Sequence, residues 1–569
     1  MKLTSKNALM VSLGHNSSAL FYDGVNKPVG YEEERLNGLK SCSAFPILAI
    51  EKIIEEVGEK AFEGATLMVS HWFDSYDFAN FKEKYFDAQY VSQLMKKYNM
   101  KNASLSGDFT HHDAHAYSSK AFLKYSLRKN HSYAIDGSMH YIVADGFGNK
   151  QEVLSIYKDD PQSPELKLLS RIYGYNNSLG LLYQYATSFC NMKENQDEYK
   201  FLGYEANILD VASEKDLQLI LSTALAFSES YMSNFSKDPA DFTFGSYINL
   251  HDLDVTKKSM YLFFHNVIKQ IGRKDDTTTR IIIGHLIQTI VETILSKIIA
   301  VFEIKNVCLS GGCFYNVKLN NSILKNVSGY VCVIPLAGDQ GAAIGLYERQ
   351  IGAFDFDDLC YGNRNLRSDI KNSKRIIIAK SEEEFVATVI TLLESNKIVN
   401  ILTGSMEFGP RALCNTSTLA LPTKVNVDYI NKLNSRNTVM PMAPVILDFN
   451  VNALFDDKDA INRTVGSNDY MIMTHDFNDE AAASEKYAGV RHKYPDKSRY
   501  SGRPQIINSK SDKPIRKILT GVKSLCLINT SFNTHGTPIL YSLGQCIFDF
   551  QKQNANDDLK INYLVVLDA

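Results

Sequence analysis

A pair of histidines four residues apart is the strongest chemical signal in the sequence. His111 and His115 stand in the segment His-His-Asp-Ala-His. On a helix they would project from the same face, close enough to bind one divalent metal ion. Exposed or structural histidines at a polar helix start would show the same spacing. A zincin-type protease site is disfavoured, because His112 stands where that chemistry needs a glutamate.

Carboxylates at two expected strand ends strengthen the case for a metal. Asp145 follows the apolar run Tyr141–Ala144, and Asp339 follows Val331–Pro335, each beside a glycine. A short side chain at a strand end can reach into a cleft, although Asp next to Gly is also ordinary turn chemistry. A mixed nitrogen and oxygen ligand set would suit Fe(II), Zn(II) or Mn(II), and the spacing does not choose among them.

The second half of the chain concentrates loop residues suited to an anion. The segment Gly404–Leu413 combines glycines and a proline with Arg411, which could make a bidentate phosphate contact. Arg436 and Arg503 stand in similar loops, and Asn529–Asn533 adds hydroxyl and amide donors. One such arginine is usually a surface charge. Three of them favour a polyanionic ligand and predict a phosphate-binding α/β enzyme.

Three weaker signals lie in the first half. Ser310–Gly312 follows the apolar run Val307–Leu309 and would let the backbone approach a nucleotide closely, although adjacent glycines are common in loops. His15 and Lys40 are candidates for contact with an anion or a carbonyl group. A turn histidine is more often structural, and an exposed lysine is more often only solvated.

The elements that must position these residues follow an α/β pattern. Ala8–Leu13 and Ala19–Tyr22 predict two strands around the turn Gly14–Ser18. Later apolar strands run into glycine-containing loops, with helical patterns between them. This arrangement is typical of an α/β sheet whose ligands gather at the strand ends.

A domain boundary is expected between about residues 350 and 374, where the periodicity lapses. Beyond it, Ser381 and Glu384 form a capping box for a predicted helix that ends near Glu394. Residues 456–514 are polar and rich in turns, so we expect long ordered loops over a site.

Length and composition limit the number of domains, the kinds of partner and the cellular location to be expected. A chain of 569 residues is too long for one ordinary core, so two or more domains are expected. A formal charge of −3 offers no basic field for nucleic acid. Polar residues recur through the apolar stretch Arg280–Phe302, which predicts an amphipathic core helix and no membrane span. The nine scattered cysteines contain no C-x-x-C pair and the N-terminus shows no signal peptide, so we expect a cytoplasmic protein.

Taken in order, these segments resemble the NodU/CmcH family of O-carbamoyltransferases over nearly the whole chain. The most specific string is Met-Glu-Phe-Gly-Pro-Arg-Ala-Leu at positions 406–413. The other matching segments are moderate alone and strong as an ordered set: Gly14–Ala19, Glu32–Arg35, His111–His115, Asp197–Lys200, Ser310–Gly312 with Asn316, Ala337–Asp339 and Asn529–Asn533.

The resemblance implies an architecture of two α/β domains. Residues 1–360 would form a TsaD-like carbamoyl-transfer domain of the actin/sugar-kinase superfold. Residues 375–569 would form a YrdC-like domain that makes carbamoyl-adenylate from carbamoyl phosphate and ATP. The last 25 or so residues could pack on the first domain.

The resemblance also implies roles for individual residues. The metal, most simply Fe(II) in this family, would be held by His111, His115, Asp145 and Asp339. His15 and Lys40 would polarise the carbamoyl group during its transfer to a hydroxyl of a small-molecule, natural-product acceptor. ATP with Mg(II) and carbamoyl phosphate would be bound by the remaining set: Gly311, Gly312, Asn316, Arg411, Arg436, Arg503, Ser531 and Asn533.

Four departures from the family pattern leave questions open. Asp136, also followed by glycine, competes with Asp145 for the place of third ligand. Cys414 stands where the family pattern has glycine, and Asn149 stands where it has glutamate. The segment 203–206 matches the family only loosely, which affects the acceptor side of the cleft.

Three further points stay open on the sequence. A tRNA-modifying threonylcarbamoyl enzyme and a sensor without turnover are the alternative functions, and the slightly acidic chain speaks against the first. The identity of the acceptor cannot be read from one sequence. A homodimer is the state that oligomer statistics favour.

Overall fold

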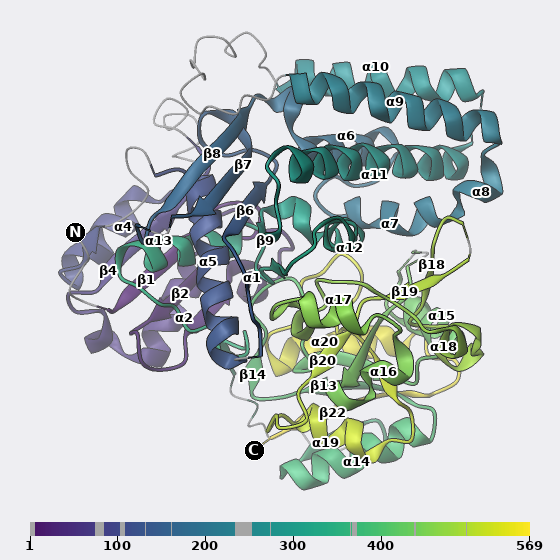
Figure 1. Ribbon diagram of the computed structural model, residues 1–569. Helices are drawn as coiled ribbons and strands as arrows, with labels where there is room; N and C mark the ends of the chain where they lie inside the picture. Colours follow the sequence, from purple (N-terminus) through teal and green to yellow (C-terminus); the bar gives the residue numbers. More distant parts are fainter. Residues whose placement is uncertain are drawn as a thin grey trace.

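The computed structural model describes residues 6–73, 85–102, 109–130, 132–160, 162–233, 253–272, 275–364, 366, 373–436, 438, 440–496 and 498–568. Its sheets and helices alternate as an α/β protein should, so the predicted fold class is confirmed. The first half forms two sheets and a layer of helices, and the second half forms a larger sheet of its own at the lower right of Figure 1.

The first sheet has five strands in the order β3-β2-β1-β4-β5. Its first three strands are antiparallel neighbours, and the last two extend the sheet in parallel. Every residue of the first two strands is buried, and they lie where the opening hairpin was predicted. The strands are β1 (Ala8–Ser12), β2 (Ser18–Tyr22), β3 (Val29–Glu32), β4 (Thr66–Ser70) and β5 (Lys101–Asn102).

The second sheet repeats this connectivity with the order β10-β9-β6-β7-β8. Again three antiparallel strands are followed by two parallel ones. No repeat is visible in the sequence, so this shared connectivity was not predicted from it. The strands are β6 (Met139–Ala144), β7 (Glu152–Asp159), β8 (Leu166–Tyr173), β9 (Asn306–Ser310) and β10 (Val331–Val333).

Two helices pack against each other between these sheets. Helix α13 (Ala342–Gln350) lies on the first sheet, and α5 (His111–Lys129) lies on the second. Their close approach depends on Gly345, because a Cβ atom there would come within 1.8 Å of the Ala114 carbonyl oxygen. The packing therefore fixes the helix that begins with the histidine motif.

A layer of helices lies beside the second sheet, at the upper right of Figure 1. Its centre is α11 (Asp276–Val301), in which Leu286, Ile290 and Ile294 are completely buried, as the predicted core helix requires. This helix is long and apolar enough to span a membrane, but 67% of its most apolar window is buried inside the protein. The other members of the layer are α6 (Leu179–Phe189), α9 (Glu214–Ser233) and α10 (Leu253–Ile271).

The C-terminal sheet has seven strands in the order β12-β22-β13-β15-β21-β16-β20. Helix α14 (Glu382–Glu394) starts at Ser381, whose hydroxyl accepts a 3.2 Å hydrogen bond from the Glu384 amide. This is one half of the predicted capping box, because the Glu384 carboxylate accepts from the Lys380 amide at 2.8 Å and not from that of Ser381. The strands are β12 (Ile376–Ala379), β13 (Ile398–Leu402), β15 (Thr416–Ala420), β16 (Ala443–Leu447), β20 (Gln505–Ile507), β21 (Cys526–Ser531) and β22 (Asn562–Leu567).

The end of the chain completes the C-terminal sheet. Strand β22 lies between β12 and β13 and pairs with both in parallel. The physical reason is that the apolar run Leu564–Val566, which is completely buried, needs hydrogen-bonding neighbours on both sides. The last 25 or so residues also touch the first domain, since Gln545 donates a 3.5 Å hydrogen bond to the Arg35 carbonyl oxygen.

Candidate functional site: a metal-ligand cluster and a cationic cavity

The first turn of α5 is held by several side chains. Thr110 and Asp113 form a capping box, in which the Thr110 hydroxyl accepts a hydrogen bond from the Asp113 amide. Asn149 accepts a 2.7 Å hydrogen bond from the His111 amide. Asn149, which stands where the resemblance led us to expect glutamate, thus helps to cap the helix that carries both histidines.

A buried ion pair lies behind this helix start. One carboxylate oxygen of Glu152 accepts a hydrogen bond from the His112 amide at 3.0 Å, and the other accepts one from the Thr110 hydroxyl at 3.0 Å. Arg171 lies 3.2 Å from that second oxygen and 2.8 Å from Asp113. His112 points into this network and donates to or accepts from the Ser155 hydroxyl, so it takes no part in the cluster formed by its neighbours.

His111, His115, Asp145 and Asp339 converge on one point, with ligand atoms that all lie within 4.8 Å of one another. The two Nε2 atoms are 3.1 Å apart. Asp145 Oδ2 lies 3.5 Å from His111 Nε2 and 3.4 Å from His115 Nε2. Asp339 Oδ1 lies 3.3 Å and 3.6 Å from the same atoms. These four residues are called the metal-ligand cluster below.

The electrostatics of the cluster favour a bound cation. Burial alone would lower the pKa of His111, but hydrogen bonds to Asp145 and Asp339 raise it to about 10. Hydrogen bonds to the same histidines outweigh the effect of burial and hold the pKa of both carboxyl groups below its usual value. Two imidazoles and two carboxylates that face one another are a donor set suited to Fe(II), Zn(II) or Mn(II), so the residues fit a divalent metal.

The backbone around the cluster leaves room only for glycine. A Cβ atom on Gly14 would lie 2.0 Å from Asp339 Oδ2, and one on Gly311 would lie 2.2 Å from the Ala144 carbonyl oxygen. Asp145 Oδ1 accepts a hydrogen bond from the Gly312 amide at 3.2 Å. Gly311 and Gly312 thus lie beside the cluster and help to orient one of its carboxylates.

The choice between the two candidate aspartates is clear from their positions. Asp136 lies on the surface, with 88% of its side chain exposed, and pairs with Lys305 at 2.9 Å. Asp145 lies at the end of β6, where the strand aims its carboxylate at both histidines. Of the two, only Asp145 belongs to the cluster.

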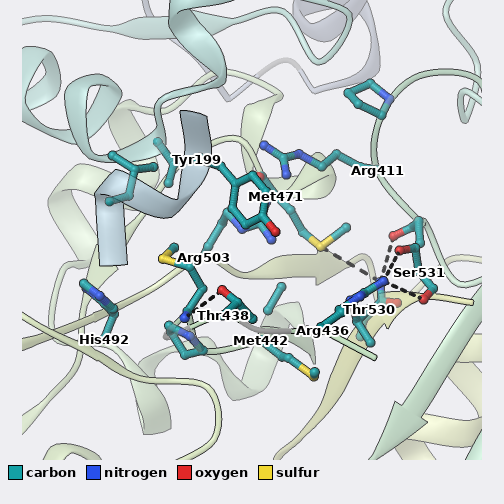
Figure 2. A pocket seen from close by; sticks show the side chains of 18 of the residues that line it. Tyr199, Arg411, Arg436, Thr438, Met442, Met471, His492, Arg503, Thr530 and Ser531 are labelled. Atoms are coloured by element: carbon teal, nitrogen blue, oxygen red, sulfur yellow. Dashed lines mark hydrogen bonds between the residues drawn. The ribbon is translucent and has the colours of Figure 1, made fainter. Parts of the chain in front are cut away.

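A cavity of about 280 Å³ lies between the two halves of the chain. Its wall contains Arg411, Arg436 and Arg503 from the second half and Lys40 from the first, and these four define what we call the cationic cavity. Figure 2 shows the three arginines around one hollow, with Thr530 and Ser531 next to Arg436. Residues of the segment 456–514 line it too, as predicted, but the segment forms helices such as α17 (Lys458–Arg463) and α18 (Asp479–Ala483) and several short strands where long loops were expected.

The arginines of this cavity differ in how they are held. Arg436 donates hydrogen bonds to Thr530, Ser531 and Asn533 at 2.9 to 3.0 Å. Arg503 donates one long bond of 3.4 Å to the Met471 carbonyl oxygen. Arg411 lies 5.9 Å from the Tyr315 ring, and its buried Nε has no hydrogen-bond partner among the described residues.

The cavity is electrostatically the opposite of the cluster. Burial lowers the pKa of Arg411 and Arg436, and burial together with the charge of Arg411 holds the pKa of Arg503 well below its usual value. Burial also lowers the pKa of Lys40. Within the described part of the chain, no carboxylate forms an ion pair with any of the three arginines. Cations left unpaired in a cavity wall are suited to a polyanion.

Two more residues with expected roles, Asn316 and His15, lie outside the cavity wall. Asn316 caps α12 (Val317–Asn326) and donates 2.8 Å hydrogen bonds to Tyr183 and Gln288, so its side chain is occupied structurally. Exposed His15 follows Gly14 next to the metal-ligand cluster and is not part of the cavity wall. We expected His15 and Lys40 to act together, but Lys40 lines the cavity and His15 lies beside the metal-ligand cluster.

Sequence reasoning did not single out several residues of the cavity. Tyr199, Tyr315, Lys318 and His492 all line it. The Tyr315 hydroxyl accepts a 3.0 Å hydrogen bond from the Gly338 amide, one residue before Asp339. Tyr315 therefore links the cluster to the cavity. Only Tyr199 stood within a segment that the resemblance had marked, and nothing marked it as a ligand.

Fold and site together define an α/β protein with a metal-ligand cluster in one half and an anion cavity between both halves. Comparison with models of protein families shows which family has this combination of fold and site. Residues 12–346 match the model of the carbamoyltransferase N-terminus, and residues 390–567 match that of the carbamoyltransferase C-terminus. The chain belongs to the carbamoyltransferase family.

Relatives agree with this assignment. An uncharacterized protein of Methanocaldococcus jannaschii is 25% identical over 97% of this chain and 98% of its own length. Nodulation protein U of Rhizobium tropici is 30% identical over 41% of this chain and 39% of its own length. Among solved structures, HypF of T. kodakarensis aligns over 62% of this chain and 49% of that one, with 13% identity and a TM-score of 0.31, too low to carry an argument.

Proposed function

We propose that this carbamoyltransferase uses ATP and carbamoyl phosphate to carbamoylate a hydroxyl group of a small natural product. The reaction would take place in two steps, activation in the cationic cavity and transfer at the metal-ligand cluster. The observation that carries the proposal is the set of three buried arginines around one cavity, none of which forms an ion pair with a carboxylate of the described residues. ATP and carbamoyl phosphate both carry phosphate groups, which would supply the negative charge that these arginines lack.

Activation answers a chemical problem. A carbamate is a poor electrophile, because its nitrogen donates electron density to the carbonyl group. Water would release carbamate and inorganic phosphate from carbamoyl phosphate. A carbamate oxygen would then attack the α-phosphorus of ATP, and magnesium-bound pyrophosphate would leave. Arg411, Arg436 and Arg503 would hold the phosphates, and Ser531 and Asn533 would fix Arg436 by accepting hydrogen bonds from its guanidinium group.

Transfer completes the cycle. The acceptor hydroxyl would lose its proton to water and attack the carbamoyl carbon, and AMP would leave with the electron pair of the broken C–O bond. His15, next to the cluster, would polarise the carbamoyl oxygen, and Lys40 would stabilise negative charge from the cavity side. Gly311 and Gly312 would let the nucleotide approach closely, with Asn316 fixing the helix beside them. A divalent metal held by His111, His115, Asp145 and Asp339 would supply Lewis-acid stabilisation there, with Fe(II) the first choice.

One assay tests the proposal. The protein would be mixed with ATP, carbamoyl phosphate and Fe(II), and pyrophosphate release and carbamoyl-adenylate formation would be followed. We expect both without added nucleic acid. No pyrophosphate under Fe(II), Zn(II) or Mn(II) would overturn the proposal, and a requirement for threonine and tRNA would point to tRNA modification instead.

Two variants test the division between sites. His115→Ala should lose carbamoyl transfer at least ~100-fold while pyrophosphate release continues, because the cluster lies outside the cavity. Arg411→Ala should lose pyrophosphate release by a similar factor. Failure of both variants at the same step would contradict the two-site assignment.

A further inference from the structure

The segment Glu32–Arg35 is buried at the end of β3 and the start of α1 (Glu33–Asn37), and the chemistry above gives it no role. We propose that this segment is a positioning device that sets the places of two cavity cations, Arg411 and Lys40, from outside the cavity. The inference rests on the proposed function, since it assumes that the cationic cavity binds phosphate groups.

The first contact reaches across to the second half of the chain. Arg35 donates to the Gly409 carbonyl oxygen at 2.6 Å, and Glu32 accepts from the Gly409 amide at 3.2 Å. Glu32 and Arg35 are joined to each other by hydrogen bonds of 2.6 and 2.9 Å. One ion pair therefore holds both backbone groups of a single residue, two positions before Arg411.

Gly409 is a point where the backbone has little freedom. Its φ of +105° suits glycine, and a Cβ atom there would lie 2.6 Å from Leu336. Arg35 and Glu32 are only 2% and 1% exposed, so water does not compete for their contacts. The turn that leads to Arg411 is thus fixed from the N-terminal half, whereas Arg411 itself has no hydrogen bond at Nε within the described residues.

The second contact concerns Lys40. Glu34 accepts a 2.7 Å hydrogen bond from the Ser41 amide, and Ser41 has a positive φ of 58°. Glu34 also lies 3.8 Å from Arg35, so the two contacts share one charge network. Lys40, directly before Ser41, lines the cavity. Displacing Ser41 would move the lysine relative to the arginines.

The third acidic residue serves as an internal control. Glu33 is 4% exposed, as buried as its neighbours, but it accepts hydrogen bonds from the Leu48 and Ala49 amides at 3.3 and 3.0 Å. These amides belong to the first turn of α2 (Ile47–Val57), which does not line the cavity. Glu33 supports the fold without touching either cation-bearing loop.

Energetics favour a positional role over a stabilising one. A buried ion pair contributes little net stability, because desolvation of both charges offsets their attraction. Its rigid geometry can still hold a ligand-binding group in place, and such supporting contacts are typically worth 10- to 100-fold in affinity or activity at built sites. The contacts to Gly409 and Ser41 have that character.

The first experiment compares isosteric variants of the full-length chain by calorimetric binding of inorganic pyrophosphate. We expect Glu32→Gln to weaken binding about 10-fold and Glu34→Gln several-fold. Glu33→Gln should change pyrophosphate affinity by less than about twofold, even if its thermal midpoint falls as much as that of Glu32→Gln. Equal weakening in Glu32→Gln and Glu33→Gln, or no weakening in Glu32→Gln, would overturn the proposal.

A double-mutant cycle tests whether the segment acts through Arg411. In an Arg411→Met background, Glu32→Gln should cost less than about twofold, because the group it positions is gone. In an Arg503→Met background it should keep its ~10-fold effect. Additive losses in both backgrounds would assign Glu32 a general structural role and reject the inference.

Two further outcomes keep the interpretations separate. If Glu32→Gln does not fold, Arg35→Lys replaces it, since lysine keeps the charge but cannot reproduce the two-pronged contact with Glu32 and Gly409. If the wild-type chain binds no pyrophosphate and releases none from ATP, the proposed function fails and the inference fails with it. If wild-type binding is intact and only the variant pattern fails, the inference alone is wrong.

Discussion

The metal-ligand cluster and the cationic cavity solve opposite electrostatic problems. In the cluster, two histidines face two aspartates, and their mutual hydrogen bonds raise the pKa of His111 and lower those of Asp145 and Asp339. In the cavity, all the principal charges are positive, and burial lowers the pKa of each arginine. The cluster is prepared for a cation and the cavity for an anion.

The two sites also differ in how they are built. The cluster draws on α5, β6 and the loop before α13, all within the duplicated sheets of the first half. The cavity needs Lys40 from the first half and Arg411 from the second. This difference shows that the geometry of the cluster depends on packing within the first half, whereas the geometry of the cavity depends on how the two halves are joined.

The sharpest way to break the cluster alone is Gly14→Ala. The new methyl group would lie 2.0 Å from Asp339 Oδ2, so the carboxylate must move. We expect metal affinity to fall about 10- to 100-fold, measured as metal retained after equilibrium dialysis. Pyrophosphate binding in the cavity should change less than twofold. An equal loss at both sites would show that they are not independent.

Arg503→Met should affect the cavity alone. It should weaken pyrophosphate binding but stabilise the ligand-free protein. Pyrophosphate affinity should fall about 10- to 100-fold, because a charge-assisted contact is lost. Stability without ligand should rise by about 1 kcal/mol, since an unpaired cation beside Arg411 is removed. Denaturant unfolding with and without pyrophosphate checks both, and a destabilised ligand-free variant would contradict the reading of Arg503 as an uncompensated charge.

Glu292 on α11 extends the comparison to a partly buried carboxyl group whose pKa is set mainly by burial, with the charges of Lys318 and His285 acting against it only weakly. Burial raises its pKa to about 7, and its Oε1 accepts a hydrogen bond from Gln288 at 2.6 Å. The folded state holds this proton more tightly than the unfolded state, so stability from this group is present below about pH 4.5 and is lost as the pH rises to about 7. Glu292→Gln should remove that decline and gain about 1–3 kcal/mol at pH 8, checked by unfolding at several pH values. If Glu292→Gln leaves the pH profile of stability unchanged, the Glu292 carboxyl group is not the source of the decline.

Cys414→Gly should have the smallest effect. Cys414 has φ of +69°, a conformation that favours glycine, the residue that the family resemblance led us to expect there. Relief of about 1–2 kcal/mol of strain would offset the loss of the buried side chain, leaving stability within about 1 kcal/mol. Pyrophosphate affinity should stay within twofold. A tenfold loss would mean that the thiol itself supports the cavity.

Much of the site was predictable because its chemistry is local. The four-residue spacing of His111 and His115 is enough to place both on one helix face. Strand-end positions brought Asp145 and Asp339 into consideration, but Asp136 had the same local pattern. Only the surface position of Asp136 and its contact with Lys305 separate the two.

Other features had no local signal. The duplicated sheets share connectivity without a visible sequence repeat, because many apolar sequences satisfy the same strand pattern. The contact of Arg35 with Gly409 joins positions far apart in the chain. Tyr315 became a link between the sites only through its contacts with Gly338 and Arg411.

The sequence by itself determined the α/β class, the histidine pair, the arginine-bearing loops and the family resemblance. These depend on residue type, short spacing and order, which the chain states directly. The tertiary structure decided which aspartate joins the histidines, that Lys40 faces the arginines while His15 stays beside the cluster, and that β22 completes the C-terminal sheet. Such choices depend on the packing of distant segments, where burial and hydrogen bonding are satisfied jointly and no single segment contains the answer.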